Sequence, residues 1–252
     1  DVRKLVRLST LTCPQRYGFS VSRMTHTLAG DFDYDTHGHG YARRRRPDPR
    51  IGALVHAALG NARSVLNVGA GAGSYEPADR YVLAVEPSAA MRAQRPPGAA
   101  PAVAATAEDL PFDDDSFDAA LATVTVHQWR DPTRGLASMR RVARGPVVVL
   151  TFDGAALDRF WLAAYVPELI EAERRRYPPV ATIAAALGRT AEVIEVPVPI
   201  DCVDGFTEAY YARPEAFLDE RVRAAQSAWG FVPAAAITRA VGQLRADLDS
   251  GT

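Results

Sequence analysis

The stretch Ser64–Tyr75 reads SVLNVGAGAGSY, and it decides the fold. A short run of mainly apolar residues, typical of a buried strand, passes directly into Gly69, Gly71 and Gly73. Glycine costs conformational entropy, so glycines at alternate positions indicate a backbone that bends sharply and comes close to something. Backbone N–H groups in such a turn can face a ligand without obstruction by a Cβ atom. A bare turn without a ligand remains the alternative at this point.

Strands and helices alternate on both sides of this turn. The apolar patterns predict strands at 64–68, 81–86, 102–105, 119–123 and 147–152. They predict helices at 51–59, 88–94 and 133–142, together with a short helix after the glycines. Such alternation is typical of βαβ units, so we expect a mostly parallel, doubly wound, Rossmann-like α/β sheet. Ligands bind such sheets at the carboxyl ends of the strands.

The last hundred residues have a different pattern. A long helix is predicted at 157–176 and shorter ones at 181–187, 205–211, 214–229 and 233–248. One strand is predicted among them, at 191–200. We therefore expect an N-terminal extension and lid at 1–50, a core at 51–200, and a helical region at 201–252 packed on that core.

The composition excludes several classes of protein. The formal net charge is −1, which argues against a general nucleic-acid binder. No apolar run approaches 18 residues, so we expect no membrane partner. Two cysteines cannot form a disulfide framework, which favours the cytoplasm. His37 and His39 lie in a glycine-rich loop, and we predict no metal site.

Acidic residues follow two of the predicted strands. Glu86 ends the second strand, where a carboxylate can accept hydrogen bonds from the two hydroxyls of a ribose. Glu108 and Asp109 follow the third strand beside Leu110, in the stretch AEDLPFDDDSFD. A carboxylate next to an apolar slot suits the exocyclic amine and the ring face of a purine. Solvated acidic side chains are the alternative for each.

Together, the stretches VLNVGAGAGSY, LAVEPSAAM, AEDLPFDDDSFDAALA and RRVARGPVVVLTFD resemble the class I S-adenosylmethionine-dependent methyltransferases. The small-molecule branch near the ubiquinone/menaquinone and trans-aconitate methyltransferases is the most similar. The resemblance covers about residues 50–152. It implies S-adenosylmethionine as the methyl donor and a small-molecule acceptor, with transfer by direct in-line displacement.

The resemblance also implies the residues that bind the donor, from the glycine turn to the end of the fourth predicted strand. They are Gly69, Ala70, Gly71, Gly73, Glu86, Pro87, Ser88, Met91, Glu108, Asp109, Leu110, Thr123 and Val124. His127, in TVTVHQWRDP, matches a position near the transferred methyl group and is the candidate catalytic residue. Imidazole can act as a base near neutral pH, and the alternative is a histidine that only begins a helix. Candidate acceptor-binding residues are Tyr41, Arg44, Trp129 and Trp161.

A core of this family normally ends in an antiparallel hairpin, and only its first strand, at 191–200, is evident. We expect that the chain is truncated before the last strand. The alternatives are that an N-terminal piece such as 2–11 fills the gap, or that the sheet has six strands. Residues 1–23 are predicted to be an extension that the fold does not need.

Two other functions remain open. One is a relative that binds the donor without transferring methyl groups. The other, less favoured, is a nicotinamide-dependent oxidoreductase, because the glycine spacing differs from G-x-G-x-x-G. The sequence leaves open the oligomeric state and whether O, N or C is methylated.

Overall fold

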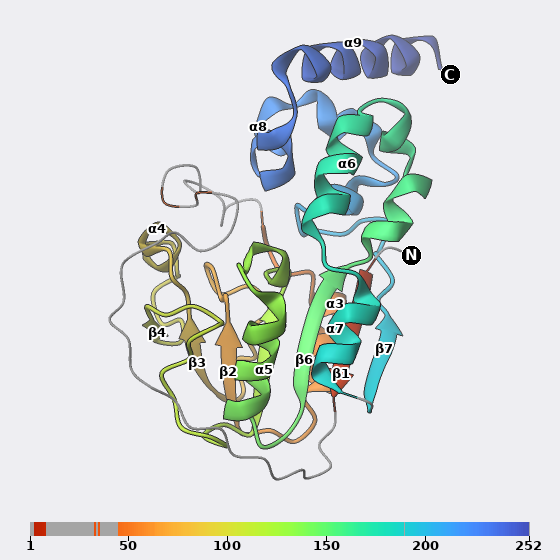
Figure 1. The fold of residues 1–252 in the computed structure, drawn as a ribbon. Coiled ribbons are helices and arrows are strands. Elements are labelled where there is room, and N and C mark those ends of the chain that lie inside the picture. Colours follow the sequence, from red (N-terminus) through yellow and green to blue (C-terminus); the bar gives the residue numbers. More distant parts are fainter. Residues whose placement is uncertain (1–2, 9–32, 34, 36–44, 189, 252) are drawn as a thin grey trace.

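The computed structural model describes residues 3–8, 33, 35, 45–188 and 190–251. Within them a seven-stranded sheet has the order β4-β3-β2-β5-β6-β1-β7 (Figure 1). The strands are β1 (Arg3–Leu8), β2 (Ser64–Val68), β3 (Tyr81–Val85), β4 (Ala102–Val103), β5 (Ala119–Thr123), β6 (Val147–Phe152) and β7 (Ala191–Glu195).

The longer helices cover the sheet and build a second lobe above it in Figure 1. They are α3 (Pro49–Ala58), α4 (Ala89–Ala93), α5 (Pro132–Val142), α6 (Pro167–Arg176), α7 (Val180–Leu187), α8 (Glu220–Ala224) and α9 (Ala234–Ser250). Short 3₁₀ turns connect them: η1 (Val126–Gln128), η2 (Gly154–Arg159), η3 (Trp161–Ala164), η4 (Thr207–Tyr210), η5 (Pro214–Leu218) and η6 (Ser227–Phe231).

The parallel part of the sheet confirms the predicted strands. β2 pairs in parallel with β3 and β5, and β5 pairs in parallel with β6. Every residue of β6 is buried, as expected for a strand that is covered on both faces. The parallel strands end at the same edge, which places the glycine turn, Glu86 and the end of β5 close together.

The N-terminal strand corrects the expectation of a truncated sheet. β1 lies between β6 and β7 and is antiparallel to both, with Val6 opposite Val149 and Val193. Leu5 and Val6 are fully buried in the core. Residues 3–8 therefore supply the strand that completes the antiparallel edge. The expectation that the fold does not need residues 1–23 is wrong for this strand.

The helix expected after the glycines is absent, because the segment from Gly69 to Arg80 forms turns. Tyr75 has a φ of 63°, which interrupts a right-handed helix, and Pro77 follows it. Glu76 ties the segment down by accepting from Asn67 Nδ2 at 3.0 Å and by pairing with Arg95 at 2.8 Å. The glycine turn is thus held by side chains and not by a helix.

The predicted helix at 157–176 is broken into η2, η3 and α6. Pro167 cannot donate a backbone hydrogen bond, so it stands at the first turn of α6 and not within a longer helix. The pieces pack with η5, η6 and α9 around a second apolar cluster that includes Leu162, Leu169, Phe217 and Leu244. This cluster is the core of what we call the helical lobe, residues 154–176 and 205–250.

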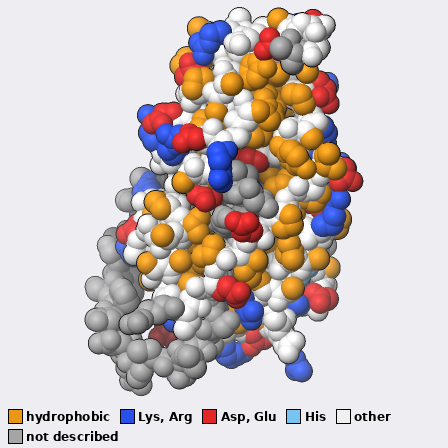
Figure 2. All heavy atoms as spheres, turned by 90° about the vertical axis from the view of Figure 1, so that its right-hand side faces the viewer, with side chains coloured by type: hydrophobic (Ala, Val, Ile, Leu, Met, Phe, Trp, Pro, Cys, Tyr) orange, Lys and Arg blue, Asp and Glu red, His pale blue; other side chains and the backbone are white. Residues whose placement is uncertain are grey.

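Strand β7 forms one edge of the sheet, on the right in Figure 1. Figure 2 faces this side and shows apolar side chains interspersed with acidic and basic ones. On β7 itself, Glu192 and Glu195 are exposed near Val193. Charges on an edge strand disfavour pairing with another chain. Proline at 197 ends the strand before the predicted limit of 200.

Candidate functional site

The glycine turn has the sharp bend that its sequence predicts. Gly69, Gly71 and Gly73 all have positive φ, at 67°, 52° and 97°. The N–H groups of Gly69 and Ala70 both donate to the carbonyl oxygen of Val85, at 2.8 and 3.0 Å. A Cβ atom on Gly69 would lie 2.1 Å from Oγ1 of Thr125. Glycine is therefore required here to let the turn close against the end of β5.

Glu86 joins the glycine turn to the end of β3. Its Oε2 accepts from the Gly71 N–H and its Oε1 from the Ser88 N–H, both at 2.8 Å. The side chain is buried, and burial raises the pKa of Glu86 while the two backbone hydrogen bonds oppose that rise. A carboxylate offers about four acceptor positions, so each oxygen can accept a further hydrogen bond from a ligand.

Helix α4 begins beside this carboxylate. Ser88 is the N-cap, since its Oγ accepts from the Met91 N–H at 3.1 Å. Met91 is buried, and its Cε would lie 3.3 Å from a Cβ placed on Gly71. Asp35, from the N-terminal segment, accepts from Ser88 Oγ at 2.7 Å and from Ala90 N at 2.9 Å. Pro87 lies between Glu86 and this N-cap residue in the chain.

The acidic loop after β4 has an inner and an outer side. Leu110 is buried in the main core, whereas Asp109 is exposed. One carboxylate oxygen of Glu108 is already hydrogen-bonded within the protein, because its Oε1 accepts from the Asp131 N–H at 3.1 Å, at the start of α5. Asp109 is thus more accessible to a ligand than Glu108.

The end of β5 adjoins the glycine turn. Oγ1 of Thr123 donates to the carbonyl oxygen of Ser74 at 3.4 Å. Val124 has a φ of 53°, although a β-branched residue is rarely found in this region. Strain of this kind persists only where the surroundings fix it, and it is concentrated at functional sites. Two residues further along, η1 places His127 in a buried position.

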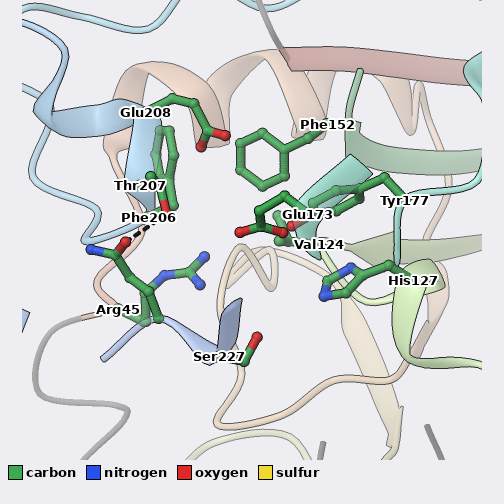
Figure 3. Close-up of a pocket in the computed structure, with 11 residues that line it drawn as sticks. Arg45, Val124, His127, Phe152, Glu173, Tyr177, Phe206, Thr207, Glu208 and Ser227 are labelled. Carbon is green, nitrogen blue, oxygen red and sulfur yellow. Dashed lines mark hydrogen bonds between the residues drawn. The ribbon is translucent and has the colours of Figure 1, made fainter. Parts of the chain in front are cut away.

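A cavity opens beyond the end of β5, between the sheet and the helical lobe (Figure 3). It takes in about 370 Å³ of space that protein atoms do not fill, part of which is open to solvent. We call it the acceptor cavity, and it is lined by Arg45, Val124, His127, Phe152, Glu173, Tyr177, Phe206, Thr207, Glu208, Gln226 and Ser227.

Aromatic rings form one wall of the acceptor cavity. The rings of His127 and Tyr177 lie 4.5 Å apart, and Phe152 contacts both Tyr177 and Phe206 at centroid distances of 5.3 and 5.4 Å. The opposite side is polar, and Gln226 is fixed there by the Thr207 hydroxyl at 2.5 Å (dashed in Figure 3). The cavity can therefore hold a partly apolar molecule that also carries polar groups.

Buried titratable groups surround the same space. Burial lowers the pKa of His127 well below its ordinary value, and Arg176 and Arg45 lower it further. Burial and the neighbouring Glu208 raise the pKa of Glu173 to about 8. Burial also raises the pKa of Tyr177 well above its ordinary value. At neutral pH His127 is uncharged, which allows it to accept a hydrogen bond or a proton, although its basicity is reduced.

Two predicted site residues line the cavity: His127, predicted as catalytic, and Val124, predicted to bind the donor. Neither of the predicted acceptor residues that the structure describes lines it. Trp129 packs instead in the main core, where a Cβ on Gly135 would meet its ring at 2.5 Å. Trp161 donates to the Tyr211 carbonyl at 2.9 Å and packs in the helical lobe. Tyr41 and Arg44 lie outside the described residues, as do His37, His39 and Cys13.

The acidic residues of the cavity were not predicted from the sequence. Glu173 follows Leu169 at a spacing of four residues, so it lies on the apolar face of α6. A charged residue at a position of the apolar face is the sequence signal that points to a buried carboxylate. Glu208 lies in a 3₁₀ turn without such a periodicity, and only the packing of the lobe shows that it is buried.

Among the described residues, no group of three or more His, Cys, Asp or Glu side chains could hold a metal ion. In the same part of the chain, no helix has the length and apolar character needed to cross a membrane.

Comparison with known proteins identifies the fold family. A family model described as a methyltransferase domain matches residues 66–149. A proposed methyltransferase from an antibiotic biosynthesis pathway of Anabaena variabilis is 30% identical, with a TM-score of 0.76. The match covers 83% of this chain and 90% of that one.

A methyltransferase from Thermotoga maritima, described as S-adenosylmethionine-dependent and a possible histamine N-methyltransferase, is 28% identical. It has a TM-score of 0.41, over 46% of this chain and 58% of that one. No curated protein matches. The similarity extends over most of the Anabaena chain, and the glycine turn and the carboxylate at the end of β3 agree with it. The chain therefore belongs to the class I S-adenosylmethionine-dependent methyltransferases.

Proposed function

We propose that this methyltransferase transfers the methyl group of S-adenosylmethionine to a small molecule that is bound in the acceptor cavity. The observation that carries the proposal is the position of this cavity. Val124 lies in its wall, and the residues on either side of Val124 contact the glycine turn. The donor crevice and the acceptor cavity therefore adjoin at the end of β5.

The donor side offers a cradle of the right chemistry. Gly71 leaves room where a Cβ would crowd Met91, and the buried Glu86 has acceptor positions left for two ribose hydroxyls. Asp109 is exposed beside the buried Leu110, which suits the amine and ring of adenine. We assign the turn from Gly69 to Gly73, with Ala70, to the methionine and ribose portions.

Further donor contacts come from the remaining predicted residues. Pro87, Ser88 and Met91 stand beside the adenine, and Thr123 and Val124 stand near the sulfur. Glu108 supports this site by holding the start of α5.

The chemistry needs alignment more than activation. The donor supplies a methyl group that is already activated by its attachment to a sulfonium. The chain holds the acceptor in line with that group and excludes water, and positioning of this kind can contribute about 7–11 kcal/mol. His127, which is neutral and lines the cavity, can take a proton or a hydrogen bond from the acceptor.

The organisation and location of the protein belong to the same proposal. We assign the core to residues 51–200 completed by β1, and residues 201–252 to a helical region that closes over the acceptor. We expect action in the cytoplasm on a small molecule and not on nucleic acid. The net charge of −1 and the absence of any membrane-spanning helix in the described part of the chain are consistent with this.

Calorimetric titration with S-adenosylhomocysteine and with NAD tests the donor assignment. The proposal predicts binding of S-adenosylhomocysteine and none of NAD, followed by turnover on some member of a small-molecule acceptor panel. Binding of NAD with comparable affinity, or failure to bind S-adenosylhomocysteine, would contradict it. Tight binding without turnover on any acceptor would favour a donor-binding relative that lacks activity.

A further inference from the structure

One carboxylate oxygen in the wall of the acceptor cavity accepts no hydrogen bond within the described part of the chain. It is Oε2 of Glu173, which is itself buried, and the whole residue is only 7% exposed. Glu173 lies among the buried residues of α6, and Figure 3 shows its carboxylate directed into the cavity. Buried polar atoms normally have a hydrogen-bond partner, and leaving one without a partner is costly. This oxygen therefore indicates a hydrogen-bond donor that a ligand brings.

Arg176, three residues further along α6, does not occupy this position. Its Nη1 lies 3.8 Å from Glu173 Oε2, beyond hydrogen-bonding distance, and it donates to Ser227 Oγ at 3.1 Å. Its guanidinium also lies over the ring of Phe231, 4.8 Å from the centroid. Arg176 is thus near enough to act on the carboxylate electrostatically, but Oε2 keeps its acceptor position.

Aromatic rings line the same cavity. Phe152 contacts Tyr177 and Phe206, and Tyr177 contacts His127. The faces and edges of such rings suit a flat aromatic skeleton. An aromatic molecule held by this wall can present one polar substituent to the Glu173 carboxylate, which is directed into the same space.

We infer that Glu173 is a catalytic residue, which accepts a hydrogen bond from an aromatic hydroxyl group of the methyl acceptor and removes its proton during the transfer. The inference rests on the proposed function, since it names the substrate class and the base of that reaction. It assigns His127, in the same cavity, a hydrogen bond to the acceptor and not the removal of the proton.

The electrostatic surroundings of Glu173 support this role. The charged or titratable side chains that line the cavity or act on Glu173 are those of Arg176, Tyr177, Glu208, Arg45 and His127. Burial and Glu208 raise the pKa of Glu173 to about 8, although Arg176, the Tyr177 hydroxyl and Arg45 oppose the rise. Phenols have a pKa of about 10, so this carboxylate takes their proton more readily than an ordinary one does. Burial lowers the pKa of His127, which makes it the weaker base.

Other acceptor groups use this oxygen less well. A carboxylate is ionised at neutral pH, so it has no hydrogen to donate to Oε2 and needs no base. An aliphatic hydroxyl is a much weaker acid than a phenol, and even a carboxylate with a raised pKa removes its proton poorly. An aliphatic amine can donate to Oε2, and it is the class that an experiment must separate from a phenol.

The transfer step balances with Glu173 as the base. The O–H bond of the acceptor breaks, and its proton passes to Oε2 of the ionised carboxylate. A lone pair of the acceptor oxygen forms the new O–C bond while the C–S bond of the donor breaks and its electron pair passes to sulfur. The positive charge of the sulfonium and the negative charge of the carboxylate disappear together, so no further reactant is needed.

Three probes that share a naphthalene ring test the substrate class: 2-naphthol, 2-naphthylmethylamine and 2-naphthoate. Each is incubated at neutral pH with the full chain and S-adenosylmethionine, and the methylated product is measured by mass spectrometry. The value of kcat/KM for 2-naphthol should exceed the values for the other two at least about tenfold. No methylation of 2-naphthol, or an equal or faster reaction of another probe, overturns the inference. Failure of S-adenosylhomocysteine to bind contradicts the proposed function instead.

The pH profile and two variants test the base. For the original chain, kcat/KM with 2-naphthol should fall as the pH drops below a midpoint at or below about 8, because the carboxylate becomes protonated. Glu173→Gln keeps the size of the side chain and removes the base, so kcat should fall at least about 100-fold and this dependence should disappear. Its affinity for S-adenosylhomocysteine should be unchanged. Glu171→Gln, on the exposed side of the same helix, is the matched control and should keep both kcat and the pH profile.

A structural role of Glu173 would give a different result. It would lower kcat without changing the shape of the pH profile, and that outcome in a folded Glu173→Gln protein overturns the inference, as does a smaller loss of kcat. If Glu173→Gln does not fold, Glu173→Asp replaces it, because this variant keeps the carboxylate and withdraws it by one methylene. It should keep the pH dependence with kcat lowered at least about tenfold, and an undiminished kcat overturns the inference.

Discussion

Glu86→Gln is the variant whose effect on donor binding follows most directly from the structure. Both carboxylate oxygens of Glu86 accept a backbone N–H, from Gly71 and from Ser88, each at 2.8 Å. The amide NH₂ of glutamine must therefore face one of these donors, and the side chain cannot keep its position. Loss of a hydrogen bond between a ribose hydroxyl and a charged acceptor costs about 1.5–3 kcal/mol.

This cost corresponds to a weakening of S-adenosylhomocysteine binding by about 10- to 150-fold. Calorimetric titration measures it, and thermal unfolding confirms that the variant is folded. Asp79→Asn is the control, because Asp79 is a highly exposed carboxylate whose ion pair is with the adjacent Arg80. Affinity within about twofold of the original chain for a folded Glu86→Gln protein would refute the assignment of the ribose to this carboxylate.

Three further predictions concern the sheet, the cavity and the candidate base. Leu5→Ala should lower the free energy of unfolding by about 2–5 kcal/mol, because Leu5 is buried in the sheet. Denaturant unfolding measures this free energy, and an unchanged value would contradict the role of β1. The raised pKa of Glu173 stabilises the fold below the ordinary value of 4.5, and this stabilisation is lost as the pH rises toward about 8. Glu173→Gln should therefore lose less thermal stability than the original chain between pH 5 and 8, and parallel pH profiles would contradict the shift. His127→Asn should lower kcat while leaving the Kd of S-adenosylhomocysteine unchanged. If kcat and the affinity for S-adenosylhomocysteine fall equally, His127 has a structural role.

The parallel half of the sheet could be predicted because its information is local. SVLNV, AALAT and VVVLTF are apolar runs whose length and composition suit only a covered strand. Glycine and an acidic residue follow two neighbouring strands at the same edge, so a donor-binding crevice could be predicted there without knowledge of the packing.

The antiparallel edge could not be predicted in this way. RKLVRL mixes basic and apolar residues without regular alternation, and it lies more than 130 residues from its partners β6 and β7. Only long-range pairing shows that this segment enters the sheet. The sequence indicated that a strand was missing, and an N-terminal piece was the alternative that proved correct.

The acceptor cavity was predicted in part. His127 was predicted from the resemblance to related methyltransferases, whereas Glu173 and Glu208 reach the cavity through the packing of the helical lobe. The tryptophans illustrate the opposite case. Trp129 and Trp161 are large and close in sequence to the site. Trp129 packs in the main core, however, and Trp161 packs against the apolar cluster of the helical lobe. Proximity in sequence does not determine on which side of a helix a ring lies.

A crystal structure of the chain with S-adenosylhomocysteine bound tests the central claim most directly. The account predicts both ribose hydroxyls on Glu86, the adenine between Met91 and Leu110, and the sulfur facing the acceptor cavity beside Val124. Adenosyl density in another part of the molecule, or a sulfur atom directed away from that cavity, would contradict it.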